Sequence, residues 1–201
     1  MSNDIVDNLP VITGVETKPP ANYSKYPTNL NFSKIGASFG IALHMHQPSI
    51  PAGGGDMHSA AIISNLQNMM ENQGYGDNHN APVFLNCYAR LGDIIPELAG
   101  NGKNPRVMLD YSGNLLWGIR QMGQDWALDK MGAITCDKQY EPYVEWLGTM
   151  WSHAVATSTP IPDLKTAHDG LASPFWRALR EKCARAGAWI FAARNASAYS
   201  S

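Results

Sequence analysis

Short apolar runs alternate with longer segments of helical periodicity from about residue 35 onward. The run over residues 35–46 is closed by Gln47 and Pro48 and predicts a buried strand. Residues 106–112 and 143–150 predict a second and a third strand. The segments between them have helical spacing, which predicts helices over 59–71, 82–98, 114–122 and 125–130. Strands that alternate with helices pair in parallel, so we expect an α/β fold.

The first 34 residues have a different character. They are polar and interrupted by prolines at positions 10, 19, 20 and 27, a pattern that predicts a flexible N-terminal extension. The segment has no apolar core of a signal peptide, and no run in the chain is apolar over the length of a membrane span.

Composition narrows the class of protein. The 201 residues are 44% hydrophobic and 16% charged, with a formal net charge of -2, which indicates a globular domain and gives no basis for a nucleic-acid or membrane partner. The three cysteines are odd in number and far apart, so we expect neither a disulfide framework nor a zinc site. A reducing compartment and a cytoplasmic location follow as expectations.

Polar and aromatic side chains gather at the predicted strand ends, where ligands bind in parallel α/β folds. The candidate substrate-binding residues are His44, His46, Gln47, Asp110, Glu145, Trp151 and His153.

His44 and His46 are two residues apart, so on a strand they point to the same side. Paired imidazoles suit hydroxyl recognition, proton transfer or metal ligation, and they are also found simply bonded to backbone carbonyls. A metal would need a third ligand, which Asp110, Glu145 or His153 could supply. Glu145 lies inside an apolar strand, where a carboxylate either faces solvent or serves a site.

Two of these strand ends carry sequences that resemble a known family. Residues 43–48, Leu-His-Met-His-Gln-Pro, resemble the opening motif of glycoside hydrolase family 57, whose members often begin with His-x-His-Gln-Pro. Residues 144–153 resemble its second motif, in which a strand Glu is followed by Gly and then by an aromatic residue and His. Residues 108–116 fit between the two motifs. The resemblance covers roughly residues 32–164.

The resemblance implies an incomplete TIM-like (β/α) barrel and a retaining mechanism on α-glucans, as in amylases, glucanotransferases and branching enzymes. Residues 35–165 would then be the first β/α units of the barrel. The implied partner is an α-glucan or maltooligosaccharide, without cofactor or metal. By their positions in the motifs, His44, His46, Gln47, Glu145 and His153 would line the donor-sugar subsite.

Catalytic residues are expected elsewhere. Retention requires two carboxyl groups about 5–5.5 Å apart, and the family places its Glu nucleophile and Asp acid/base in later motifs that this chain lacks. Residues 166–201 change in composition, with Asp169 and Glu181 as the only acids from residue 167 onward. This atypical helical tail suggests truncation or a shifted reading frame. Alternatively, Ser173 and Pro174 open a genuine terminal helix.

Three functions remain open from the sequence. The first is a fragment of an α-glucan hydrolase or transferase that is inactive alone. The second is a carbohydrate-binding module without catalysis. The third is a metal-dependent enzyme similar to polysaccharide deacetylases, which would need a metal to activate water.

Overall fold

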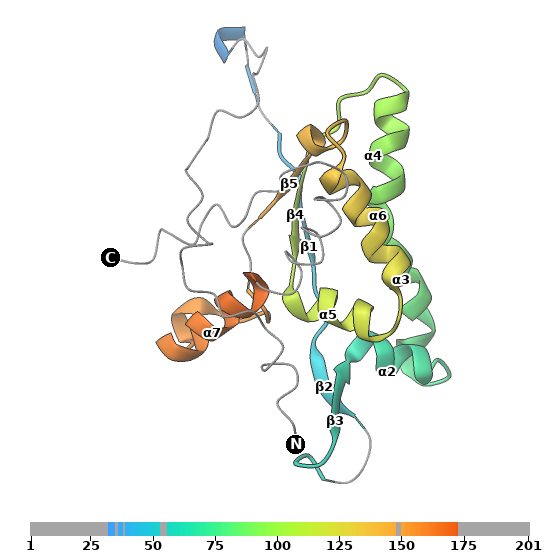
Figure 1. Ribbon diagram of the computed structural model, residues 1–201, viewed down its shortest axis with the longest axis vertical. Coiled ribbons are helices and arrows are strands. Elements are labelled where there is room, and N and C mark those ends of the chain that lie inside the picture. The colour runs from blue at the N-terminus through green and yellow to red at the C-terminus, as the bar shows by residue number, and fades with distance from the viewer. Residues whose placement is uncertain (1–31, 35, 38, 53–55, 148–149, 173–201) are drawn as a thin grey trace.

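In the part of the chain that the structure describes, three parallel strands form the main sheet (Figure 1). The computed structural model describes residues 32–34, 36–37, 39–52, 56–147 and 150–172. The strands are β1 (Ala42–Met45), β4 (Val107–Tyr111) and β5 (Val144–Trp146), in the order β1-β4-β5. The predicted α/β class with parallel pairing is confirmed.

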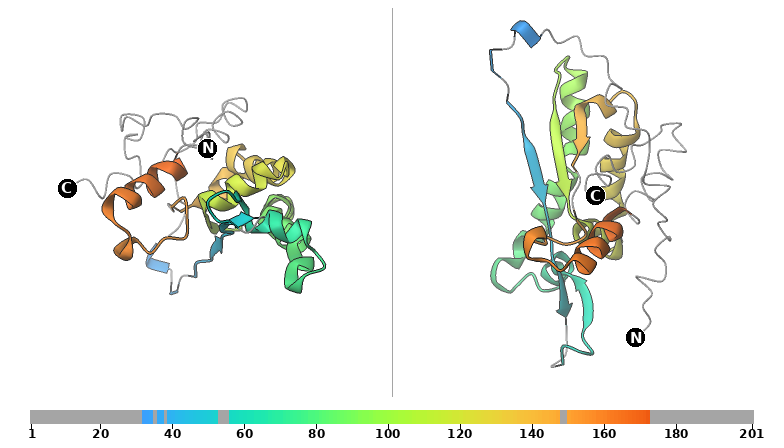
Figure 2. Two further views of the ribbon diagram at one scale, coloured as in Figure 1. Left: turned by 90° about the horizontal axis from the view of Figure 1, so that it is seen from below. Right: turned by 90° about the vertical axis from the view of Figure 1, so that its left-hand side faces the viewer.

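The helices lie mainly on one face of this sheet. Figures 1 and 2 show α3, α4 and α6 against that face and α7 on the other side. The α-helices are α2 (Asn65–Glu71), α3 (Ala81–Ala89), α4 (Leu91–Gly100), α5 (Gly113–Gln121), α6 (Asp125–Cys136) and α7 (Ile161–Ala172). Short 3-10 helices cover Phe32–Lys34, Gly76–Asn80, Glu141–Tyr143 and Ala156–Ser158.

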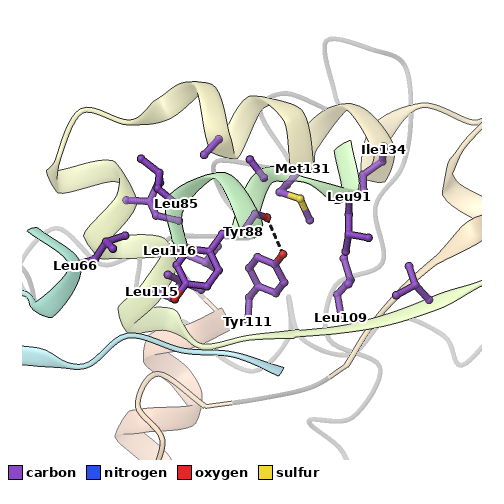
Figure 3. Packing of buried hydrophobic residues seen from close by; sticks show 14 of the residues in the cluster. Leu66, Leu85, Tyr88, Leu91, Leu109, Tyr111, Leu115, Leu116, Met131 and Ile134 are labelled. Atoms are coloured by element: carbon purple, nitrogen blue, oxygen red, sulfur yellow. Dashed lines mark hydrogen bonds between the residues drawn. The ribbon is translucent and has the colours of Figure 1, made fainter. Parts of the chain in front are cut away.

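The alternation of side chains along β4 places the core. Val107, Leu109 and Tyr111 are buried, and Met108 and Asp110 between them are half-buried on the opposite face. Figure 3 shows Leu109 and Tyr111 pointing at the helices. The fully or almost fully buried partners include Leu66, Leu85, Leu115, Ile119, Met131 and Ile134. The other face of the sheet is left without this helical layer, and His44 and Asp110 lie on it.

A buried hydrogen bond ties the sheet to α3. The Tyr111 hydroxyl donates to the Tyr88 carbonyl at 2.7 Å (Figure 3). Burial raises the pKa of the Tyr111 hydroxyl far above its ordinary value, so the group stays a donor.

The predicted helix over 59–71 is wrong in its first part. Ala61–Ser64 form β3, which pairs antiparallel with β2 (Ser49–Ala52), and α2 begins only after Ser64. The Ser64 side chain caps α2 by accepting the N–H of Leu66 at 3.2 Å. The β-branched Ile62 and Ile63 favour the extended backbone, and so short a run has too little periodicity to distinguish strand from helix.

Other predicted boundaries shift. The helix predicted over 82–98 is two helices, because Arg90 bonds to Cys87 at a spacing of three residues and α4 begins after it. The helix predicted over 125–130 continues to Cys136. The first and third strands are shorter than predicted, at Ala42–Met45 and Val144–Trp146.

Only short parts of the two ends of the chain are described. Of the predicted extension 1–34 only residues 32–34 are described, and of the tail 166–201 only residues up to 172; the helix predicted from Ser173 lies outside the described residues.

Cys87 is free, whereas Cys136 is disulfide-bonded, so the expectation of a reducing compartment loses its support from the cysteines. Among the described helices, none is both long and apolar enough to cross a membrane.

Candidate functional site

β1 and the residue that follows it place two imidazoles on the face of the sheet that lacks the helical layer. Leu43 and Met45 pack against the core, so His44 and His46 point the other way. The carboxyl ends of β1 and β4 lie side by side, because the parallel register pairs His44 with Asp110 and Met45 with Tyr111. Both histidines therefore lie on the same side of the sheet, as their spacing of two residues predicts.

Asp110 fixes the orientation of His44. Its Oδ2 lies 2.7 Å from Nδ1 of His44, and the two side chains are 26% and 44% exposed. An ionised carboxylate can only accept, so Nδ1 of His44 carries the hydrogen. In the neutral ring, Nε2 then keeps its lone pair and can accept a hydrogen bond or a proton.

The other carboxylate oxygen of Asp110 is in an unfavourable place. Oδ1 is buried, and no described residue donates a hydrogen bond to it. A buried carboxylate oxygen without a donor costs stability. The position of Asp110 is therefore better explained by its contact with His44 than by a contribution to folding.

Ser112 holds the second imidazole. Its Oγ lies 2.7 Å from Nδ1 of His46, and the same oxygen caps α5 by accepting the N–H of Leu115 at 3.4 Å. A hydroxyl can donate to Nδ1 or accept from it, so this contact fixes the ring but allows either tautomer. Ser112 was not among the predicted site residues; a serine immediately before a predicted helix is the signal that identifies a cap.

His153 joins the two histidines from a distant segment. Its ring centroid lies 4.8 Å from that of His44 and 5.0 Å from that of His46, and the His44 and His46 centroids are 6.3 Å apart. We call His44, His46 and His153 the histidine cluster. The histidine cluster thus brings together residues from the end of the first strand and from the segment after the third strand, at the carboxyl edge of the sheet.

The surroundings of His46 favour its neutral ring. Burial lowers the pKa of His46 most, and the neighbouring His153 and His44 lower it further, while Asp110 acts in the opposite direction. At neutral pH the His46 ring is therefore uncharged and can both donate and accept hydrogen bonds, which matches the dual character of a hydroxyl group.

Gln47 lies apart from the cluster. It is only 8% exposed, its side-chain nitrogen donates to the Tyr88 hydroxyl at 2.8 Å, and its oxygen accepts from Asn65 at 3.1 Å. Both ends of the amide are thus used inside the protein. The structure gives Gln47 a role in joining β1 to α2 and α3.

Glu145 and Trp151 occupy the edges of the site. Glu145 pairs in register with Met108, which lies two residues before Asp110 on β4. Glu145 therefore faces the same side of the sheet as Asp110 but lies farther from the carboxyl edge, and no hydrogen bond to its carboxylate is found among the described residues. Trp151 is half-buried and packs over Gly113 at the start of α5.

The described residues contain no group of three or more His, Cys, Asp or Glu side chains that is arranged to hold a metal ion. The rings of the histidine cluster are instead stacked or tilted, with interplanar angles of 25° to 43°. The His44 side chain is 44% exposed and His153 is exposed, so both rings can meet a polar ligand.

Comparison of the chain with protein-family models, with curated proteins and with solved structures finds no match in any of the three. Any functional assignment therefore depends on the site itself.

Proposed function

We propose that this chain provides the first β/α units of a TIM-like barrel that processes α-glucans, and that the histidine cluster binds a glucose unit of the glucan. The chain as it stands binds sugar without cleaving it, because the carboxylate pair of a retaining enzyme is not among its motifs. The observation that carries the proposal is the contact of His153 with both His44 and His46, since it joins the two sequence segments that resemble glycoside hydrolase family 57.

The strand order supports the barrel. Successive parallel strands stand next to each other in chain order, and α3, α4 and α6 lie on one face. A doubly wound fold would reverse the order and place helices on both faces, whereas a barrel adds each strand beside the last and keeps helices outside. Within the described part of the chain β1 and β5 each have one neighbour, so strands can be added at both edges. The position of α7 on the other side departs from the barrel pattern.

The chemistry of the cluster supports a sugar ligand. Asp110 holds the His44 ring through Nδ1 and leaves its Nε2 as an acceptor. The surroundings of His46 keep that ring neutral. Sugar hydroxyls need donors and acceptors in fixed places, and strand-end residues on a rigid sheet provide them. The face is accessible, since the His44 side chain is 44% exposed.

The deacetylase alternative receives no support from the arrangement of the described side chains. Metal-assisted deacetylation requires protein ligands that converge on the ion, and no such group is found among the described residues.

Isothermal titration with maltoheptaose tests the proposal. We expect saturable binding that weakens about tenfold in His153→Ala, the scale of one good hydrogen bond to a polar ligand. His58→Ala is the matched control, because His58 is exposed and outside the cluster, and its binding should equal that of the wild type.

A parallel assay for new reducing ends separates binding from turnover. We expect no release of sugar above background. Absence of binding would overturn the proposal. Robust hydrolysis abolished by Glu145→Gln would contradict the part that places the catalytic carboxylates outside this chain.

A further inference from the structure

The segment that carries His153 is docked on the first turn of α5. The N–H of Gly113 donates to the Met150 carbonyl at 3.3 Å, and the N–H of Asn114 donates to the Trp151 carbonyl at 2.8 Å. The first N–H groups of a helix have no partner within the helix, so this segment supplies the missing acceptors. On its other side, the N–H of Trp151 donates to the Ala167 carbonyl of α7 at 2.8 Å.

The docking requires a glycine at position 113. A Cβ atom added there would lie 2.6 Å from Cε3 of the Trp151 indole and 3.0 Å from the Trp151 Cα. Real Cβ contacts are longer than this, so any side chain at position 113 would push Trp151 and its backbone away from α5.

His153 depends on this docking for its place. Within the described part of the chain, no hydrogen bond to the His153 ring is found, whereas His44 and His46 are each held by a partner at 2.7 Å. The ring lies two residues beyond Trp151. Its distance from the other two rings is therefore determined by where the backbone of 150–153 sits.

We infer that Gly113 and Trp151 are positioning residues, which hold His153 against His44 and His46 through the docked backbone. Trp151 therefore acts through His153 and not as a stacking surface for a sugar ring. The inference goes beyond the proposed function, because it concerns the assembly of the cluster and holds for any ligand.

The pKa of His46 reports the position of His153. Burial lowers this pKa, and the nearby His153 and His44 lower it further against the opposing effect of Asp110. If His153 moves away, one of the causes that lower the pKa is removed, and the value rises toward the ordinary 6.5. A merely structural role of Gly113 would change stability and leave this pKa unchanged.

The experiment is a pH titration of the imidazole 15N signals of the full chain by NMR. The variants are Gly113→Ala and His153→Ala, and the second gives the His46 pKa when His153 is absent. Gly118→Ala is the matched control on the same helix: its Cβ would lie 2.5 Å from the Ser64 Cβ, a similar steric conflict with a residue outside the cluster.

We expect the His46 pKa to rise in Gly113→Ala toward the value in His153→Ala, and to stay at the wild-type value in Gly118→Ala. An unchanged pKa in Gly113→Ala, or an equal rise in Gly118→Ala, would overturn the inference. If Gly113→Ala does not fold, Trp151→Ala replaces it: the His46 pKa should rise there too, and a wild-type value would refute the role. No sugar is present, so failure here is distinct from failure of the proposed function.

Discussion

Asp110 and His44 face each other across the parallel pair of β1 and β4, with Oδ2 and Nδ1 2.7 Å apart. The contact joins the two strands at their carboxyl ends and determines which nitrogen of His44 is free to meet a ligand. Most of the expected behaviour of the site follows from this pair and from the two imidazoles beside it.

Replacement of Asp110 by Ala should release the tautomer of His44. Without an acceptor beside Nδ1, the hydrogen of the neutral ring is shared between the two tautomers, so Nε2 is an acceptor in only a part of the molecules. The 15N shifts of the His44 ring should change from a single tautomer to a mixture. Sugar affinity should fall about threefold to tenfold. Retention of the wild-type tautomer in Asp110→Ala would show that something other than the carboxylate fixes His44.

Stability should decrease as the pH falls below about 6.5, the ordinary pKa of histidine. The pKa of His46 is lowered in the folded protein, so below 6.5 the unfolded chain binds more protons and the contribution of His46 to stability is lost. The free energy of unfolding, measured in urea between pH 7.5 and pH 5, should decline less steeply in His46→Gln than in the wild type. An identical slope in both proteins would show that His46 does not contribute.

Ser112 serves the helix and the site at once, and a matched pair of variants separates the two roles. Ser112→Ala and Ser64→Ala each remove a side-chain cap, of α5 and α2 respectively, and each should cost about 1 kcal/mol in the free energy of unfolding. Only Ser112→Ala should change the His46 15N shifts, because Ser112 Oγ is the partner of Nδ1. Equal effects of the two variants on His46 would contradict this assignment.

The two faces of the sheet should differ sharply in their tolerance of truncation. Leu109 is fully buried against the helices, so Leu109→Ala should cost about 2–5 kcal/mol. Met108, the preceding residue on the opposite face, is half-buried, and Met108→Ala should cost less than about 1.5 kcal/mol. Urea denaturation measures both. Similar costs would show that the face bearing the histidine cluster is also packed.

Much of this fold could be predicted from the alternation of side chains along the strands. The alternation of side chains in β4 and the common direction of His44 and His46 follow from a period of two. The same period places Gln47 on the opposite side, where it bonds to a residue of the core. The resemblance to a sugar-site motif had instead placed Gln47 in the substrate-binding site.

What could not be predicted depended on register and on close approach. The pairing of His44 with Asp110 requires the alignment of two strands, and no single strand contains that information. The pairing of β2 with β3 was missed because four-residue runs carry too little periodicity. The approach of Trp151 to Gly113 comes from tertiary packing, which a lone glycine in the sequence does not reveal.

The most direct test of the proposed sugar site is a titration of the chain with maltotetraose, followed by the imidazole 15N–1H NMR signals. We predict that the signals of His44, His46 and His153 shift together and saturate, while those of the exposed His58 and His79 stay in place. Absence of shifts in all three cluster histidines at millimolar sugar would contradict the proposed site, as would equal shifts at His58 and His79.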